Sequence, residues 1–169
     1  MAACAVEDCV KFHGHLCGGI TIGYVMSRFA MEQIGAKPGD DLYCVTEFQN
    51  CMTDAVQCVT GCTAGKGNLE VKNYGKRALT LVHADTGEGV RVRVEYTFPE
   101  GLSKEECAVR VLEEDPAEIC RAVPVKINVP QRKPITYVRC DNCMEEFAQF
   151  CGVQVGSQFC CPECAAKLQ

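Results

Sequence analysis

The stretch that decides the fold is His13-Gly-His-Leu-Cys17-Gly-Gly19, which leads directly into an apolar run. Residues 20–34 carry apolar side chains at helical spacing, and the run ends at Gly35 with a proline three residues later. This pattern predicts a helix over 20–34. Cys17 should therefore lie at the helix N-terminus, where unpaired N–H groups and the helix dipole favour a thiolate or a bound anion.

The same stretch carries three side chains that bind transition metals. In an extended backbone, His13, His15 and Cys17 occupy alternate positions and would project to one side. Two imidazoles and a thiol can converge on an ion of the zinc, nickel, iron or copper type, because these ions favour nitrogen and sulfur donors. The stretch predicts one half of a metal or redox site.

A second cysteine-rich segment, residues 51–62, reads CMTDAVQCVTGC. Its spacing predicts a helix over 51–60 on which Cys51, Asp54 and Cys58 share one face. If the fold joins the two segments, the candidate metal ligands are His13, His15, Cys17, Cys51 and Cys62. Glu47 and Asp54 could ligate, orient a histidine or transfer protons.

The glycine-rich loop over 61–68 is a candidate for binding an anionic group. Lys66 and the loop amides could receive that group, and the candidate cofactor-binding residues are Gln57, Gly65, Gly67 and Asn68. The loop is one residue short of a phosphate loop and lacks the hydroxyl residue after its lysine, which excludes nucleotide hydrolysis. The candidate catalytic residues are Cys17 and Cys51 as thiolates, with Asp54 and Lys66.

The remaining patterns up to residue 130 predict a mixed fold. Residues 42–48, 79–83, 90–98 and 123–129 have the pattern of strands. Ser103 and Asp115 each begin a motif with capping-box spacing, which predicts two short helices. We therefore expect an α+β core domain over 1–130, with an antiparallel-type sheet packed against helices.

Two C-x-x-C pairs end the chain after a proline-rich linker over 130–134. Their spacing is that of a four-thiolate zinc site, with Cys140, Cys143, Cys161 and Cys164 as ligands. Cys160 could compete, but Cys161 preserves the two-residue gap. We expect a treble-clef zinc finger over 135–169, with a helix over 162–168. Iron has the same ligand set in a rubredoxin-like site.

Composition limits the class of protein. The chain has 169 residues, 47% of them apolar, and a formal net charge of -5, which argues against nucleic acid and anionic membrane as partners. The tail has two basic and four acidic residues over 135–169, which argues against DNA binding there as well. Fifteen cysteines without an export signal indicate reduced thiols, a cytoplasmic location and a host that lives with little oxygen.

Several motifs occur in order between about residue 8 and about residue 98: HGHLC over 13–17, CMTDAVQ over 51–57, TGCTAGKGNL over 60–69 and YGK over 74–76. With Glu47, they resemble the FmdE family, which is named after formylmethanofuran dehydrogenase. The resemblance implies an α+β core, a treble-clef finger, homodimers, and a metal-binding or catalytic cleft at the histidine-cysteine motif. Cys58 departs from the family's usual apolar residue and would add a thiol near the site.

The leading functional hypothesis is a metal-dependent redox or metal-handling protein of anaerobic one-carbon (formyl/formate) metabolism. It would hold structural zinc in the tail and a second transition metal, zinc, nickel or iron, in the core. One alternative is a non-catalytic accessory subunit that delivers metal or molybdopterin to a molybdenum or tungsten dehydrogenase partner. Another is a ligand-sensing module.

Overall fold

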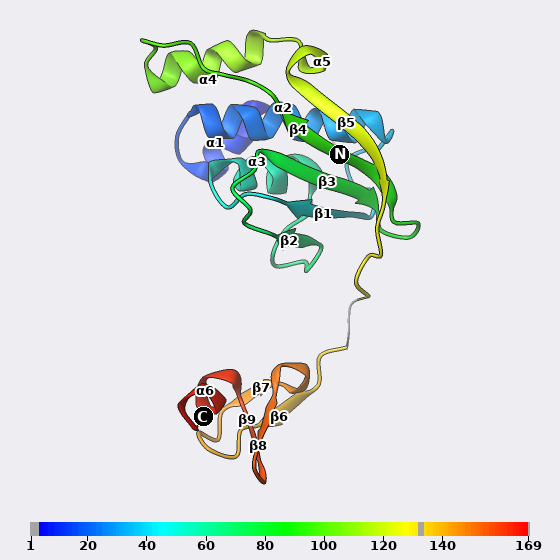
Figure 1. Ribbon diagram of the computed structural model, residues 1–169, viewed down its shortest axis with the longest axis vertical. Helices are drawn as coiled ribbons and strands as arrows, with labels where there is room; N and C mark the ends of the chain where they lie inside the picture. Colours follow the sequence, from blue (N-terminus) through cyan, green and yellow to red (C-terminus); the bar gives the residue numbers. More distant parts are fainter. Residues whose placement is uncertain (1–3, 132–133, 169) are drawn as a thin grey trace. The chain divides into compact units, whose positions relative to one another are not determined.

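The computed structural model describes residues 4–131 and 134–168, which form two compact units that divide after Pro130 (Figure 1). The first unit is the α+β fold expected from the sequence, with a sheet packed against helices. Its elements are α1 (Val6–His13), α2 (Gly18–Gln33), β1 (Leu42–Thr46), α3 (Cys51–Thr60), β2 (Leu69–Val71), β3 (Ala78–His83), β4 (Glu88–Val94), α4 (Lys104–Glu113), α5 (Pro116–Ile119) and β5 (Cys120–Lys126).

The sheet of the first unit has the strand order β2-β1-β3-β4-β5. Neighbouring strands run antiparallel except for β1 and β2, which are parallel. Alternate residues of β1 face opposite sides, as the pleat requires. Leu42 and Cys44 join the main core with the helices, whereas Tyr43 and Val45 pack with Val82 on the other face.

Two parts of the first unit differ from the sequence prediction. The backbone around His13 is not extended, because His13 is the last residue of α1. Gly14 takes the left-handed conformation (φ 97°) and ends α1, and Cys17 is the N-cap of α2. The sequence pattern also does not predict β2, because this strand has three residues, too few for a visible alternation, and forms through its pairing with β1.

Both predicted caps are present, as a reciprocal capping box at Ser103 and as an N-cap at Asp115. The Ser103 hydroxyl accepts a hydrogen bond from the Glu106 N–H at 3.2 Å, and the Glu106 carboxylate accepts one from the Ser103 N–H at 2.8 Å. Asp115 accepts a hydrogen bond from the Ala117 N–H at 2.9 Å. These bonds satisfy N–H groups at the starts of α4 and α5. None of the helices in 4–131 and 134–168 is long and apolar enough to cross a membrane.

The second unit is small and built around sulfur. It contains β6 (Tyr137–Arg139), β7 (Glu146–Ala148), the 3-10 turn η1 (Gln149–Cys151), β8 (Val153–Val155), β9 (Gln158–Cys160) and α6 (Pro162–Leu168). Strands β6 and β7 form one hairpin, and β8 and β9 form another. Its buried core cluster is Cys140, Cys160, Cys164 and Ala165. So little aliphatic surface is a weak source of folding energy, which favours a metal-stabilised unit.

Helices α2 and α3 approach each other closely at two glycines of α2. A Cβ atom added at Gly23 would lie 2.7 Å from the Met52 carbonyl oxygen and 2.9 Å from the Ala55 Cβ. A Cβ atom added at Gly19 would lie 2.8 Å from the Cys51 Cβ. These contacts bring the first turn of α3 against the first two turns of α2.

We predict that Gly23→Ala destabilises the protein by about 1–3 kcal/mol, because the new methyl group would meet backbone atoms of α3 that cannot rotate away. Chemical denaturation of the purified variant measures this. Gly65→Ala is the control, since a Cβ atom there would meet nothing within 4 Å. Equal stability of the two variants would contradict the proposed close packing.

Candidate metal centres

The tail cysteines form a compact group. The Sγ atoms of Cys140, Cys143, Cys161 and Cys164 all lie within 4.8 Å of one another and could hold a metal ion such as zinc. The Cys161 N–H donates to the Cys140 Sγ atom at 3.3 Å. Hydrogen bonds from the backbone at Cys143 and Cys161 lower the pKa of the Cys140 thiol to about 6, which favours the thiolate that a metal needs. Cys160 is buried beside this group but is not one of the four.

A second group lies in the first unit, where the ends of three helices meet. Ligand atoms of His13, Cys17 and Cys51 lie within 4.8 Å of one another. His13 ends α1, Cys17 caps α2, and Cys51 is the first residue of α3. Asn50 fixes the start of α3, because its side chain accepts a hydrogen bond from the Met52 N–H at 3.0 Å.

Asp54 orients the imidazole of His13. The Nδ1 atom of His13 lies 2.8 Å from Oδ2 of Asp54, and the His13 side chain is 13% exposed. A carboxylate partner assigns the ring proton to Nδ1, which leaves the lone pair on Nε2. That Nε2 atom is buried and has no hydrogen-bond partner among the described residues. A buried acceptor without a partner, on an imidazole grouped with two thiols, fits a metal ligand that is already oriented.

Gly19 lies next to both sulfur atoms. A Cβ atom at this position would lie 3.6 Å from the Cys51 Sγ atom and 3.7 Å from the Cys17 Sγ atom. A side chain here would therefore crowd the sulfur atoms and the first turn of α3. The donor set fits a transition metal of the zinc, nickel or iron type.

Two electrostatic effects oppose each other at the thiols. The N-terminal ends of α2 and α3 both favour negative charge at Cys17 and Cys51. Burial raises the pKa of Cys51, and the neighbouring Cys17 thiol raises it further. A bound cation would relieve the repulsion between the two thiolates, so metal binding and loss of the thiol protons would be coupled.

The other two candidate ligands are not in this group. His15 is exposed, and its ring centroid lies 4.6 Å from that of His13, so it flanks the site. Cys62 follows the opposite end of α3 and is fully buried, and burial raises its pKa to about 11. The ten residues of α3 span about 15 Å, which separates Cys62 from Cys51.

The glycine-rich loop also lies at that opposite end of α3. The Lys66 amino group donates to the Gly61 carbonyl at 3.0 Å and so caps α3. Asn68 accepts from the Thr63 N–H at 2.9 Å and donates to the Leu42 carbonyl at 3.0 Å. Gly65 and Gly67 are exposed. The bonds of Lys66 and Asn68 stabilise the loop itself, and the structure does not bring the loop to Cys17 and Cys51.

Gln57 and Glu47 have structural partners. The Gln57 side chain lies 3.4 Å from Asp54 and accepts from the Ala64 N–H at 3.3 Å, which links the loop to α3. Glu47 accepts two hydrogen bonds from the Arg91 guanidinium, which lowers the pKa of the carboxyl group. Glu47 therefore forms an ion pair with Arg91 of β4.

The fold and these two groups define an α+β protein with cysteine clusters that could hold metal ions. Residues 12–124 match the family described as FmdE, molybdenum formylmethanofuran dehydrogenase operon. The chain belongs to the FmdE family.

Two known proteins are similar to this chain over different lengths. A solved structure described as a tungsten formylmethanofuran dehydrogenase FmdE-like protein, from Syntrophus aciditrophicus, is 26% identical with a TM-score of 0.74. That match covers 99% of this chain and 98% of the other. A probable S-adenosyl-L-methionine-binding protein from Archaeoglobus fulgidus is 43% identical over 90 residues, which is 50% of this chain. The chain matches 25% of the length of that relative.

We predict that Cys143→Ser weakens metal binding by the tail more than about 100-fold, because a coordinating thiolate is lost. Metal content and limited proteolysis over 134–168 measure the effect. The matched control is Cys151→Ser, an exposed cysteine of the same unit outside the four. A metal-free tail that resists proteolysis as well as the metal-loaded protein would contradict metal-coupled folding.

We predict that Asp54→Asn weakens metal binding at the core group about 10–100-fold, because the amide is a poorer partner for the Nδ1–H of His13. A competition titration with a coloured chelator measures the affinity. Asp85→Asn is the control, since Asp85 accepts only a local bond from the Thr86 N–H at 2.8 Å. An unchanged affinity in Asp54→Asn would argue that His13 does not ligate.

Proposed function

We propose that this protein is a metal-dependent redox or metal-handling protein of anaerobic one-carbon (formyl/formate) metabolism. In this proposal, His13, Cys17 and Cys51 hold a transition metal in the core, and the four tail cysteines hold a structural zinc. The observation that carries the proposal is the grouping of the His13 imidazole with two thiols, together with a buried Nε2 atom on that ring that has no hydrogen-bond partner among the described residues.

The chain's own residues would divide the work at the core site as follows. Cys17 and Cys51 would supply negative charge at two helix N-termini, and Asp54 would keep the ring proton of His13 on Nδ1. Three protein donors leave a position for a substrate or water, as in catalytic metal sites. A bound metal would supply Lewis-acid or electron-transfer chemistry there. The exposed His15 could exchange protons between the site and solvent.

The metabolic setting rests on the relatives. The description of the family names a molybdenum formylmethanofuran dehydrogenase operon, and that of the matched solved structure names a tungsten formylmethanofuran dehydrogenase. A dehydrogenase partner, a homodimer and a cytoplasmic location are therefore parts of the proposal. Absence of nucleic acid and membrane partners is also part of it, and the net charge of -5 supports it.

Two alternatives use the same site differently. As an accessory subunit, the protein would carry metal or molybdopterin to a dehydrogenase and would release its core metal readily. As a ligand sensor, it would bind a small molecule in the core unit. The relative from Archaeoglobus fulgidus makes S-adenosyl-L-methionine the first ligand to try, by equilibrium dialysis with the full-length protein.

Elemental analysis of anaerobically purified protein tests the proposal. We expect about two equivalents of metal per chain, one for each cysteine group. Cys51→Ser should remove one equivalent while the tail keeps its own. Cys107→Ser, a half-buried cysteine on α4 outside both groups, should keep two.

The rate of metal exchange separates the proposal from the carrier alternative. A catalyst should retain its core metal against a chelator for hours, whereas a carrier should lose it within minutes. One equivalent of metal in the native protein, lost in Cys143→Ser and retained in Cys51→Ser, would exclude the core metal altogether.

A further inference from the structure

A different group of sulfur atoms lies along the contact between α1 and α3. Cys9 is a buried residue of α1, Cys58 is on α3, and Cys4 precedes α1. The Sγ atoms of Cys4 and Cys9 are 3.7 Å apart, and the Cys58 thiol is near enough to raise the pKa of Cys9. The proposed core metal site uses none of these three cysteines.

We propose that Cys4 and Cys9 form a redox-active dithiol that is oxidised to a disulfide by a small, negatively charged disulfide. The two sulfur atoms need to approach from 3.7 Å to about 2 Å to form the bond. Cys4 lies outside the helix, so it can make this movement while α1 keeps its backbone hydrogen bonds. The proposal does not depend on the core metal.

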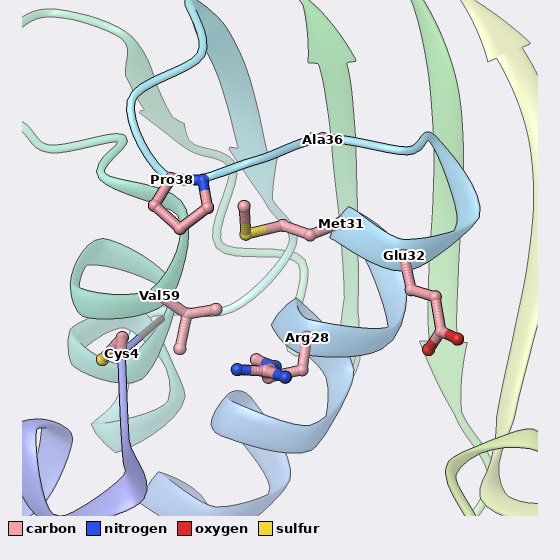
Figure 2. Close-up of a pocket in the computed structure, with 7 residues that line it drawn as sticks. All are labelled: Cys4, Arg28, Met31, Glu32, Ala36, Pro38 and Val59. Carbon is pink, nitrogen blue, oxygen red and sulfur yellow. The ribbon is translucent and has the colours of Figure 1, made fainter. Parts of the chain in front are cut away.

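The oxidant would bind in a pocket beside Cys4. Figure 2 shows this pocket of about 200 Å³, with Cys4 and Val59 on one side and Arg28 and Glu32 on the other. The remaining lining residues are Met31, Ala36 and Pro38. Its volume is below that of pockets for drug-sized ligands, so it suits a short-chain molecule. Its wall combines an apolar surface for the chain with the Arg28 guanidinium, which can pair with a negative charge, and with the Glu32 carboxylate, which opposes one.

The surroundings of the two thiols distinguish their roles. Burial and the charge of Asp8 raise the pKa of Cys4, whereas the hydrogen bond with Cys9 and the charge of Arg28 act in the opposite direction. Burial raises the pKa of Cys9 strongly, and the Cys4 and Cys58 thiols raise it further. Cys4 is therefore the attacking thiol, and Cys9 reacts second.

The exchange balances in two steps. The Cys4 thiolate attacks one sulfur atom of the small disulfide, which breaks its S–S bond and releases the first thiolate, which takes up the proton that Cys4 gave up. Cys9 then attacks the Cys4 sulfur of the mixed disulfide and releases the second thiolate, which takes up the Cys9 proton. The protein loses two electrons and two protons, and the small disulfide becomes two thiols.

Peptide mass spectrometry tests this directly. Reduced, metal-loaded, full-length protein is incubated anaerobically with 3,3′-dithiodipropionate, a disulfide with two carboxylates, and its free thiols are then alkylated. Cleavage after Lys11 leaves Cys4 and Cys9 in one peptide. We expect this peptide to lose two hydrogens and to resist alkylation. In Cys9→Ala, the mixed disulfide should accumulate on Cys4 because no second thiol resolves it.

Arg28→Gln tests the pocket. We expect oxidation by dithiodipropionate to slow about threefold to tenfold, because a nearby positive charge is lost. Oxidation by the neutral 2-hydroxyethyl disulfide should keep its rate. Equal effects on both reagents would overturn the assignment of the pocket.

Two variants protect the test from artefacts. Cys107→Ser should leave the oxidation of Cys4 and Cys9 unchanged, since Cys107 lies on α4. Cys4→Ser should abolish the reaction while the metal content remains that of the native protein. A failure of the dithiol proposal is therefore distinguishable from a failure of the proposed metal-dependent function. Selective oxidation of Cys107 or Cys151, with Cys4 and Cys9 still reduced, would overturn the proposal.

Discussion

The close approach of α2 and α3 is the constraint on which the core unit depends. Gly19 and Gly23 face α3 at distances that exclude even a methyl group. The approach places the N-terminal ends of two helices together, and their partial positive charges repel each other. Thiolates at Cys17 and Cys51 would offset that repulsion. The packing that the fold requires thus sets two helix N-termini, which favour anionic sulfur, against burial, which raises the pKa of Cys51.

Helix α1 completes this arrangement through its contact with α3. His13 and Asp54 meet at one level of the contact, and Cys9 and Cys58 lie near each other about one helical turn away. The two levels match because Cys9 and His13 are four residues apart on α1, and Asp54 and Cys58 are four residues apart on α3. The first level orients the His13 imidazole. The second is a set of thiols. A short helix therefore links two kinds of sulfur chemistry, and its position depends on polar contacts as well as on apolar burial.

Strong local signals explain which parts of the fold were predictable. The α3 helix, the two capping motifs and the alternating strand β4 are visible in the sequence, because caps and periodicity act over a few residues. Helix α1 has only eight residues, and its alanine N-cap has no side chain that could accept a bond, although the Asp8 carboxylate accepts from the Ala5 N–H at 2.9 Å. A helix this short depends on tertiary contacts. The role of Lys66 could not be predicted from the sequence, because its amino group donates to the Gly61 carbonyl just after α3, a contact that has no sequence pattern.

The two units differ in how their folds relate to metal. The core unit has a continuous apolar cluster from its helices and strands, so its fold does not require an ion. The tail unit has a buried cluster of three cysteines and one alanine, so a metal would supply much of its folding energy. A metal could therefore leave the core site without unfolding the core unit, whereas loss of the tail metal would unfold the tail. Exchange and catalysis both require the first kind of site, and a structural role suits the second.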